Sequence, residues 1–134
     1  MSRREARESA FKLLYQMEMR KTETKPQRDL FLQEYPLNEA DVAYFDELVE
    51  GVSLHEADLD AAYSPLLIGW KTERLPRVDL VILRIATFEI LMRKDVPVSV
   101  SISEAVILAK RYSTEEAKSY INAVLGKIEP GEKE

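Results

Sequence analysis

The chain has 134 residues, of which 46% are hydrophobic and 32% are charged, and it carries a formal net charge of -5. A chain of this size can bury one hydrophobic core without disulfides or metals, so we expect a single domain. The absence of cysteine excludes disulfide frameworks and cysteine nucleophiles, and the one histidine, His55, excludes a cluster of histidine ligands. No apolar run has the length of a secretory signal or approaches the ~20 residues that span a bilayer, so a cytoplasmic protein without membrane contact is expected.

The charge is distributed unevenly along the chain. Residues 1–25 contain seven Lys or Arg against four Asp or Glu, a net charge of +3, and the remaining 109 residues carry -8. An acidic body confines any nucleic-acid binding to local basic patches and favours a second, basic partner for the rest of the surface.

The first half of the chain has helical periodicity with two interruptions. Apolar residues recur at spacings of three and four from residue 2 to residue 20, and Ser2 with Glu5 matches a capping box at the start. A break over 21–27 precedes a short predicted helix over 28–35. Asn38 with Asp41 is typical of the next helix start.

The third helix is predicted to be long. The apolar stripe after Asn38 keeps its phase across Gly51 and continues to about residue 67, which favours one helix over two short ones. Ile68 to Trp70 is interpreted as the exit turn, and His55 as an exposed helix residue.

The second half predicts three more helices. Apolar residues cover almost every side of the predicted helix over 77–93, so this helix is expected to be central and buried. The helical period resumes over 101–112 after a short strand-like alternation at 96–102. Ser113 and Thr114 precede a last helix, which Pro130 and Gly131 end.

These elements predict an all-α fold, a compact bundle of about six or seven helices in two small subdomains. The expected boundaries are 1–70 for the N-terminal subdomain and 71–130 for the C-terminal subdomain, followed by a charged tail at 131–134.

The basic start of the first helix is the most informative surface. On a helical wheel Arg3, Arg4 and Arg7 lie on one flank with Phe11 and Tyr15. Guanidinium groups that bind phosphates, beside aromatic rings that stack on bases, are typical of an RNA-contacting surface. A solvated helix face is the alternative, although cations in a first helical turn oppose the macrodipole and a bound phosphate would offset that cost.

Other polar patterns have structural interpretations. Ser113 with Glu116, and Ser101 with Glu104, match capping boxes. The adjacent carboxylates Glu115 and Glu116 point about 100° apart on a helix and cannot form an acid–base pair. Arg84 and Glu89, inside the most apolar helix, are interpreted as a paired structural network rather than a catalytic one, so we expect no enzyme.

Six further segments follow one another along the chain: RREARE (3–8), LYQ (14–16), RVDLVILRIA (77–86), DVPVSVSISEA (95–105), LAKRY (108–112) and YINAVLGK (120–127). In this order they resemble the NusB transcription antitermination family. The resemblance covers nearly the whole chain and implies an all-helical protein without catalysis, metal or cofactor.

The family resemblance also implies partners and site residues. It implies binding to boxA-type RNA of ribosomal RNA transcripts together with the ribosomal protein NusE, within an RNA polymerase antitermination complex. The RNA-binding positions that match are Arg3, Arg4, Arg7, Glu116 and Tyr120. The positions that match at or near the NusE-binding face are Tyr15 and Asp79.

Three departures and two alternatives accompany this resemblance. Glu5 stands where some members have arginine, Ser119 where many have lysine and Ala123 where many have glycine, so contacts around Tyr120 are expected to differ in detail. One alternative is an RNA-binding module related to the front domain of a ribosomal-RNA methyltransferase, although the chain leaves no room for a methyl-donor fold. The other is a helical dimerisation scaffold without an RNA role, and a homodimer is also compatible with the family reading.

Overall fold

The computed structural model describes residues 3–20, 24–67 and 75–130. Within these residues there are seven α-helices and one short 3-10 helix, with no strand, which confirms the predicted all-α class. The helices are α1 (Arg3–Arg20), α2 (Thr24–Glu34), α3 (Glu39–Leu54), α4 (Glu56–Tyr63), η1 (Ser64–Leu66), α5 (Arg77–Met92), α6 (Val98–Tyr112) and α7 (Glu115–Gly126).

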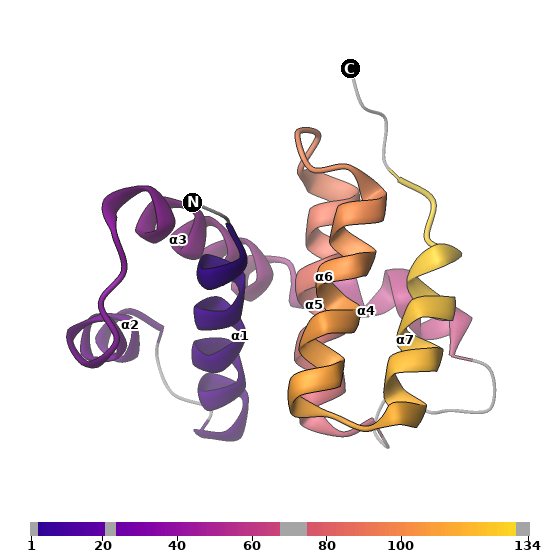
Figure 1. Ribbon diagram of the computed structural model, residues 1–134, viewed down its shortest axis with the longest axis horizontal. Helices are drawn as coiled ribbons and strands as arrows, with labels where there is room; N and C mark the ends of the chain where they lie inside the picture. The colour runs from indigo at the N-terminus through magenta and orange to yellow at the C-terminus, as the bar shows by residue number, and fades with distance from the viewer. Residues whose placement is uncertain (1–2, 21–23, 68–74, 131–134) are drawn as a thin grey trace.

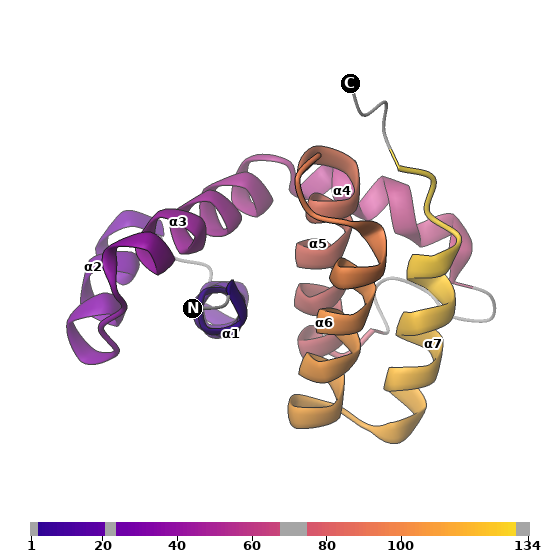
Figure 2. The same cartoon turned by 45° about the horizontal axis from the view of Figure 1, so that its top comes forward.

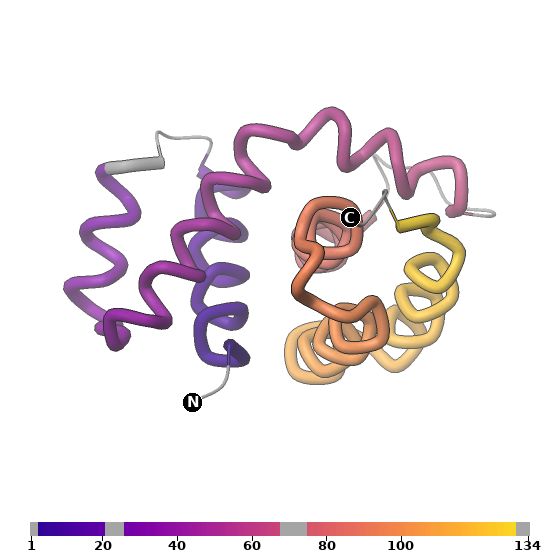
Figure 3. Tube along the Cα trace, turned by 90° about the horizontal axis from the view of Figure 1, so that it is seen from above, coloured from indigo at the N-terminus to yellow at the C-terminus, as the bar shows by residue number. Residues whose placement is uncertain are grey.

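The helices form two groups joined through α4. In Figure 1, α1, α2 and α3 lie on one side and α5, α6 and α7 on the other, with α4 behind the second group. Figure 2 shows α3 and α4 following one another along the same edge of the molecule. In the view from above, α1 lies between α3 and the α5–α6 pair, so one of its flanks faces each group (Figure 3).

Helix α5 is the centre of the fold, as its sequence predicts. Every residue from 79 to 90 is buried, including the polar Asp79, Arg84 and Glu89. Helices α1, α3, α4, α6 and α7 all pack against it. The buried apolar side chains of these helices join in one core, so the fold has one hydrophobic centre.

The first half differs from the sequence prediction at two places. Helix α2 begins at Thr24 rather than at residue 28, because Pro26 is tolerated in a first helical turn, where its missing N–H needs no partner. The predicted long helix over 39–67 is divided at His55, whose backbone leaves the helical region at φ -112° and ψ 20°. His55 is therefore a half-buried junction between α3 and α4, and not an exposed residue within a helix. The predicted exit turn at 68–70 lies outside the described residues.

Gly51 keeps helical continuity and serves packing instead. A Cβ atom built at this position would come within 2.3 Å of the Phe88 ring. The absence of a side chain at Gly51 thus allows α3 to approach α5 closely.

Three helix starts can be compared with their predicted caps. The Asn38 side chain accepts a hydrogen bond from the Asp41 backbone N–H at 2.9 Å, as predicted. At α7 the cap is Thr114, which accepts from the Ala117 N–H at 3.0 Å, so the predicted capping role of Ser113 is wrong. Helix α6 begins at Val98, directly after Pro97, so Ser101 is interior to the helix and its predicted cap is also wrong. The Ser2 cap lies outside the described residues.

No helix within the described ranges is long and apolar enough to cross a membrane. Helix α4, which precedes the predicted subdomain boundary near residue 70, packs against α5. The division at that boundary stays a prediction.

Candidate nucleic-acid interface

The arginine-bearing flank of α1 faces the C-terminal helices. Arg7 is only 6% exposed and Phe11 only 3%, whereas Arg3 and Arg4 are exposed. The wheel places these residues on one flank correctly, but tertiary packing covers the part of it that lies against α5 and α6. On this flank Arg7 and Phe11 are thus buried inside the fold, and Arg3 and Arg4 remain at the surface.

Arg7 belongs to a buried ion-pair network. Its Nε donates to Glu89 of α5 at 2.8 Å, and its Nη1 lies 3.8 Å from Glu104 of α6. The same Glu89 oxygen accepts the Tyr44 hydroxyl of α3. Burial, followed by the charge of Glu89 and this hydrogen bond, raises the Tyr44 pKa above its ordinary value of 10.0. Arg7 thus links three helices through one carboxylate.

Arg4 makes a bidentate contact with Glu104. Its Nη2 donates to Oε2 at 2.9 Å and its Nε donates to Oε1 at 3.2 Å. The hydrogen bond and charge of Glu104 raise the Arg4 pKa above its ordinary value. Because half of the Arg4 side-chain surface remains exposed, its outer N–H groups still face solvent.

Arg3 lies over an aromatic ring beside a second arginine. Its guanidinium carbon is 4.3 Å from the centre of the Tyr44 ring, and that of Arg93 is 4.9 Å from it. Asp95 bridges the two cations, accepting from Arg3 at 3.1 Å and from Arg93 at 3.0 Å. Arg93 also pairs with Glu47 of α3.

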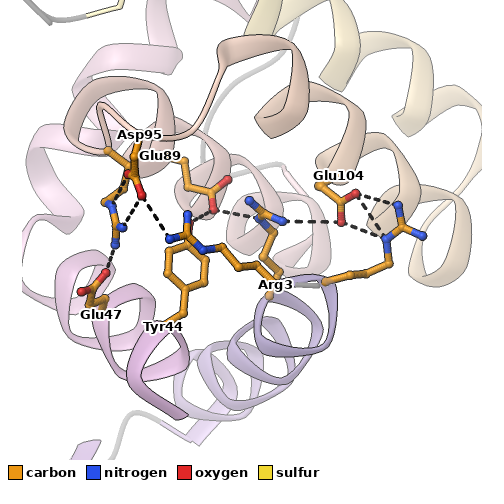
Figure 4. A network of polar contacts seen from close by, with 9 residues as sticks. Arg3, Tyr44, Glu47, Glu89, Asp95 and Glu104 are labelled. Atoms are coloured by element: carbon orange, nitrogen blue, oxygen red, sulfur yellow. Dashed lines mark hydrogen bonds and ion pairs between the residues drawn. The ribbon is translucent and has the colours of Figure 1, made fainter. Parts of the chain in front are cut away.

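The contacts in Figure 4 run from Glu47 through Arg93, Asp95 and Arg3 to the Tyr44 ring. From the Tyr44 hydroxyl they continue through Glu89 and Arg7 to Glu104 and Arg4. The network joins α1 and α3 to α5, α6 and the turn between them. Its outer members, Arg3 and Arg4, have exposed side-chain fractions of 42% and 50%, and its inner member Arg7 has 7%. Arg3 and Arg4 can therefore contact a macromolecule directly, whereas Arg7 cannot.

Asp79 and Tyr120 lie together at the other end of α5. Asp79 is 1% exposed, and its carboxylate accepts the Ser113 hydroxyl at 2.5 Å and the Tyr120 hydroxyl. Burial and the Asp79 hydrogen bond raise the Tyr120 pKa above its ordinary value of 10.0. The Tyr120 ring is half-buried, and Glu116, one turn earlier on α7, is exposed.

Tyr15 borders an apolar groove near the same end. The groove, of about 440 Å³, is lined by Phe11, Lys12, Tyr15, Gln16, Met19, Arg20, Val78 and Tyr112. Phe11 is stacked with Tyr15 at 6.2 Å between ring centres and contacts the Tyr112 ring at 4.9 Å. The groove thus lies between the second half of α1, the first turn of α5 and the end of α6.

The structure therefore divides the candidate residues into two clusters. The arginines pair with Glu89, Asp95 and Glu104, and the second cluster contains Asp79, Tyr120, Glu116 and the groove. Ten residues of helix separate Asp79 from Glu89, a rise of about 15 Å. A single ligand that touches both clusters must be extended along the molecule.

Comparisons with known proteins agree with this architecture. The model of the NusB family matches residues 4–130. The chain belongs to the NusB family. The transcription antitermination protein NusB of Acetivibrio thermocellus is 44% identical over 128 residues, covering 96% of this chain and 88% of that protein.

Solved NusB structures have the same fold. The T. maritima NusB structure superposes with a TM-score of 0.87 at 32% identity, over 95% of this chain and 89% of that one. A crystal structure of the antitermination factors NusB and NusE in complex with dsRNA has a TM-score of 0.84 at 26% identity, covering 94% and 96% of the two chains.

In this NusB-family chain the carboxylates were the residues that sequence reasoning missed as neighbours of the arginines. Glu104 was assigned to a cap and Asp95 to a break, and each lies more than 90 positions from its arginine in the sequence. The one available signal was charge within the apolar central helix, which predicted a structural network for Arg84 and Glu89. Both charges are paired, but with different partners: Arg84 donates to Asp60 at 2.8 Å and Glu18 at 3.1 Å, and Glu89 accepts from Arg7.

Proposed function

We propose that this chain is a non-catalytic transcription antitermination factor. In this proposal it binds boxA-type RNA of ribosomal RNA transcripts together with NusE, as part of an RNA polymerase antitermination complex in the cytoplasm. The observation that carries the proposal is the pair of exposed arginines on α1, in a fold that matches a NusB chain crystallised with NusE and dsRNA.

The RNA-binding roles follow from exposure. Arg3 and Arg4 hold backbone phosphates through their outward N–H groups. Arg7 acts inside the fold, because its pairs with Glu89 and Glu104 hold α1 against α5 and α6. Tyr120 stacks on an unpaired base, and Glu116 lines the same part of the surface. Because the clusters are about 15 Å apart along α5, an extended single strand suits the site better than a compact ligand.

NusE would occupy the groove beside Tyr15. The lining is largely apolar and aromatic, as is usual at the core of a protein interface. Asp79 lies next to this face, because the preceding residue, Val78, lines the groove. A protein held there while RNA crosses the arginines would bind the RNA at high effective concentration.

The test is a titration of fluorescent boxA-type RNA with this chain, with and without NusE. A scrambled RNA of equal length is the control, and both are measured at about 50 and 200 mM salt. We expect NusE to tighten binding of the boxA-type RNA at least tenfold and to leave the scrambled RNA weak. Equal binding of both RNAs with no gain from NusE would refute the proposal.

A homodimer is the second candidate occupant of the groove. The observation that favours it is the exposure of Met19 (57%) and Tyr112 (37%) at the groove rim. Sedimentation of the free chain decides between the two. If NusE dissociates the dimer, the dimer contact lies in the groove. If the dimer persists and RNA binding is unchanged, the dimerisation scaffold is favoured instead.

A further inference from the structure

Asp79 is enclosed by the C-terminal helices and has almost no surface to offer a partner. It is the third residue of α5 and is 1% exposed. Its Oδ1 accepts the Ser113 hydroxyl at 2.5 Å, and its Oδ2 accepts the Tyr120 hydroxyl. Both oxygens of the carboxylate are thus used inside the molecule.

The groove wall is directly connected to this carboxylate. Val78 and Tyr112 line the groove, and they are the sequence neighbours of Asp79 and Ser113. The hydroxyl bonds therefore join the first turn of α5, the residue that ends α6 and the middle of α7. One side of this junction faces the groove and the other holds Tyr120.

We propose that Asp79 is a positioning residue that couples the protein-binding groove to Tyr120. It fixes the tyrosine ring for RNA, and a protein seated on Val78 and Tyr112 strengthens this fixation. This inference rests on the proposed function, because it concerns how groove occupation and RNA binding influence each other.

The physical basis is the strength and geometry of the two hydroxyl bonds. A hydroxyl that donates to a carboxylate forms a shorter and stronger bond than one between neutral groups. The Ser113 bond holds the Asp79 carboxylate in place, and the Tyr120 bond fixes the hydroxyl end of the tyrosine and thus its χ1 rotamer, so less freedom is lost when a base stacks on the ring. A protein that orders Val78 and Tyr112 orders the same junction, and RNA then binds with a smaller entropic cost.

The experiment measures a coupling factor in the full chain, defined as the ratio of RNA dissociation constants without and with NusE. The variants are Tyr120→Phe, Asp79→Asn and the double variant. Tyr120→Phe keeps the ring and removes only the hydroxyl. Tyr44→Phe is the matched control, because its hydroxyl also donates to a buried carboxylate, Glu89, but at the other end of α5.

We expect each single variant to lower the coupling factor about fivefold or more, on the scale of one hydrogen bond to a charged group. The double variant should lose no more than either single variant, since Tyr120→Phe removes the hydroxyl donor and Asp79→Asn removes the charge and one acceptor oxygen of the same contact. Tyr44→Phe should keep the coupling factor. Because coupling is reciprocal, RNA must change the NusE affinity by the same factor in every variant.

The outcomes separate this inference from the proposed function. If the unmodified chain gains no RNA affinity from NusE, the proposed function fails. If it does gain affinity but Tyr120→Phe keeps the full factor, the positioning role of Asp79 is overturned. The positioning role is also overturned if Asp79→Asn weakens NusE binding by the same factor in the unmodified chain and in Tyr120→Phe. That result would mean that Asp79 contacts NusE directly. Should Asp79→Asn fail to fold, Tyr120→Phe alone decides, because it removes a single hydroxyl.

Discussion

Replacing Arg7 by methionine should destabilise the fold far more than it alters the surface. Methionine keeps most of the aliphatic volume but leaves Glu89, which is 1% exposed, without its cation at 2.8 Å. Breaking a buried pair by removing one partner costs about 3–5 kcal/mol, because an uncompensated charge stays in the core. Domains of this kind have free energies of unfolding of roughly 5–15 kcal/mol, so this loss is a large fraction of the total.

The assay is urea unfolding followed by circular dichroism, with thermal melts in parallel. For a chain of this length the loss corresponds to a decrease in melting temperature of roughly 10–18 °C. The m-value should stay unchanged if only the folded state is affected. Arg4→Met is the matched control, because Arg4 shares Glu104 but is half exposed, and its effect on unfolding should be much smaller.

A double variant tests whether the uncompensated charge of Glu89 causes the loss of stability. Adding Glu89→Gln to Arg7→Met removes the isolated charge while keeping an acceptor for the Tyr44 hydroxyl. The double variant should therefore be more stable than Arg7→Met alone. A loss below about 1 kcal/mol for Arg7→Met, or a double variant less stable than the single, would refute the reasoning.

Three further predictions concern packing, pH and RNA affinity. Gly51→Ala should lower the free energy of unfolding by about 1–2 kcal/mol, since the clash with Phe88 outweighs the better helix propensity of alanine. The Arg93 hydrogen bond holds the pKa of Asp95 well below its ordinary value of 3.8, so its stabilising effect is present above that value and is lost as the pH falls through the lowered folded pKa. The unfolding free energies of the unmodified chain and Asp95→Asn should thus converge as the pH falls from about 4. Glu104→Gln should tighten RNA binding about threefold to tenfold, because it releases Arg4 from a competing carboxylate.

Each of these predictions has a defined opposite result. Gly51→Ala with unchanged stability would mean that the Phe88 ring moves aside freely. A pH-independent difference for Asp95→Asn would mean that the carboxylate does not titrate against its arginines. For Glu104→Gln the control is Glu5→Gln, an exposed carboxylate of α1 with the same charge. Equal tightening by both variants would assign the effect to net charge alone.

Helix existence and the central position of α5 could be predicted because they depend on local periodicity. Apolar residues on almost every side of the helix over 79–90 have one physical outcome, burial all round. The break at His55 could not be predicted, because the apolar phase continues through it. Both helices pack on α5, but α3 also packs extensively on α1, so the break depends on contacts of the whole fold.

The candidate site was predictable in its residues but not in its connections. The helical wheel placed the arginines and Tyr15 on one flank of α1. The family resemblance added Glu116, Tyr120 and Asp79, and the NusE-binding role of Tyr15. Neither could indicate that Arg7 is buried against Glu89, since the partners are 82 positions apart. Ser113 shows the same limit, because its local pattern is a cap while its actual partner is Asp79, 34 positions away.

The salt dependence of RNA binding tests the central claim most directly. The claim is that Arg3 and Arg4 hold phosphates, whereas Arg7 acts inside the fold. The dissociation constant for boxA-type RNA, with NusE present, would be measured over a range of salt for the unmodified chain and for Arg3→Gln/Arg4→Gln. Two lost phosphate contacts to a single strand should reduce the slope of log K against log salt by about 1.4. An unchanged slope, with the double variant folded, would contradict the account.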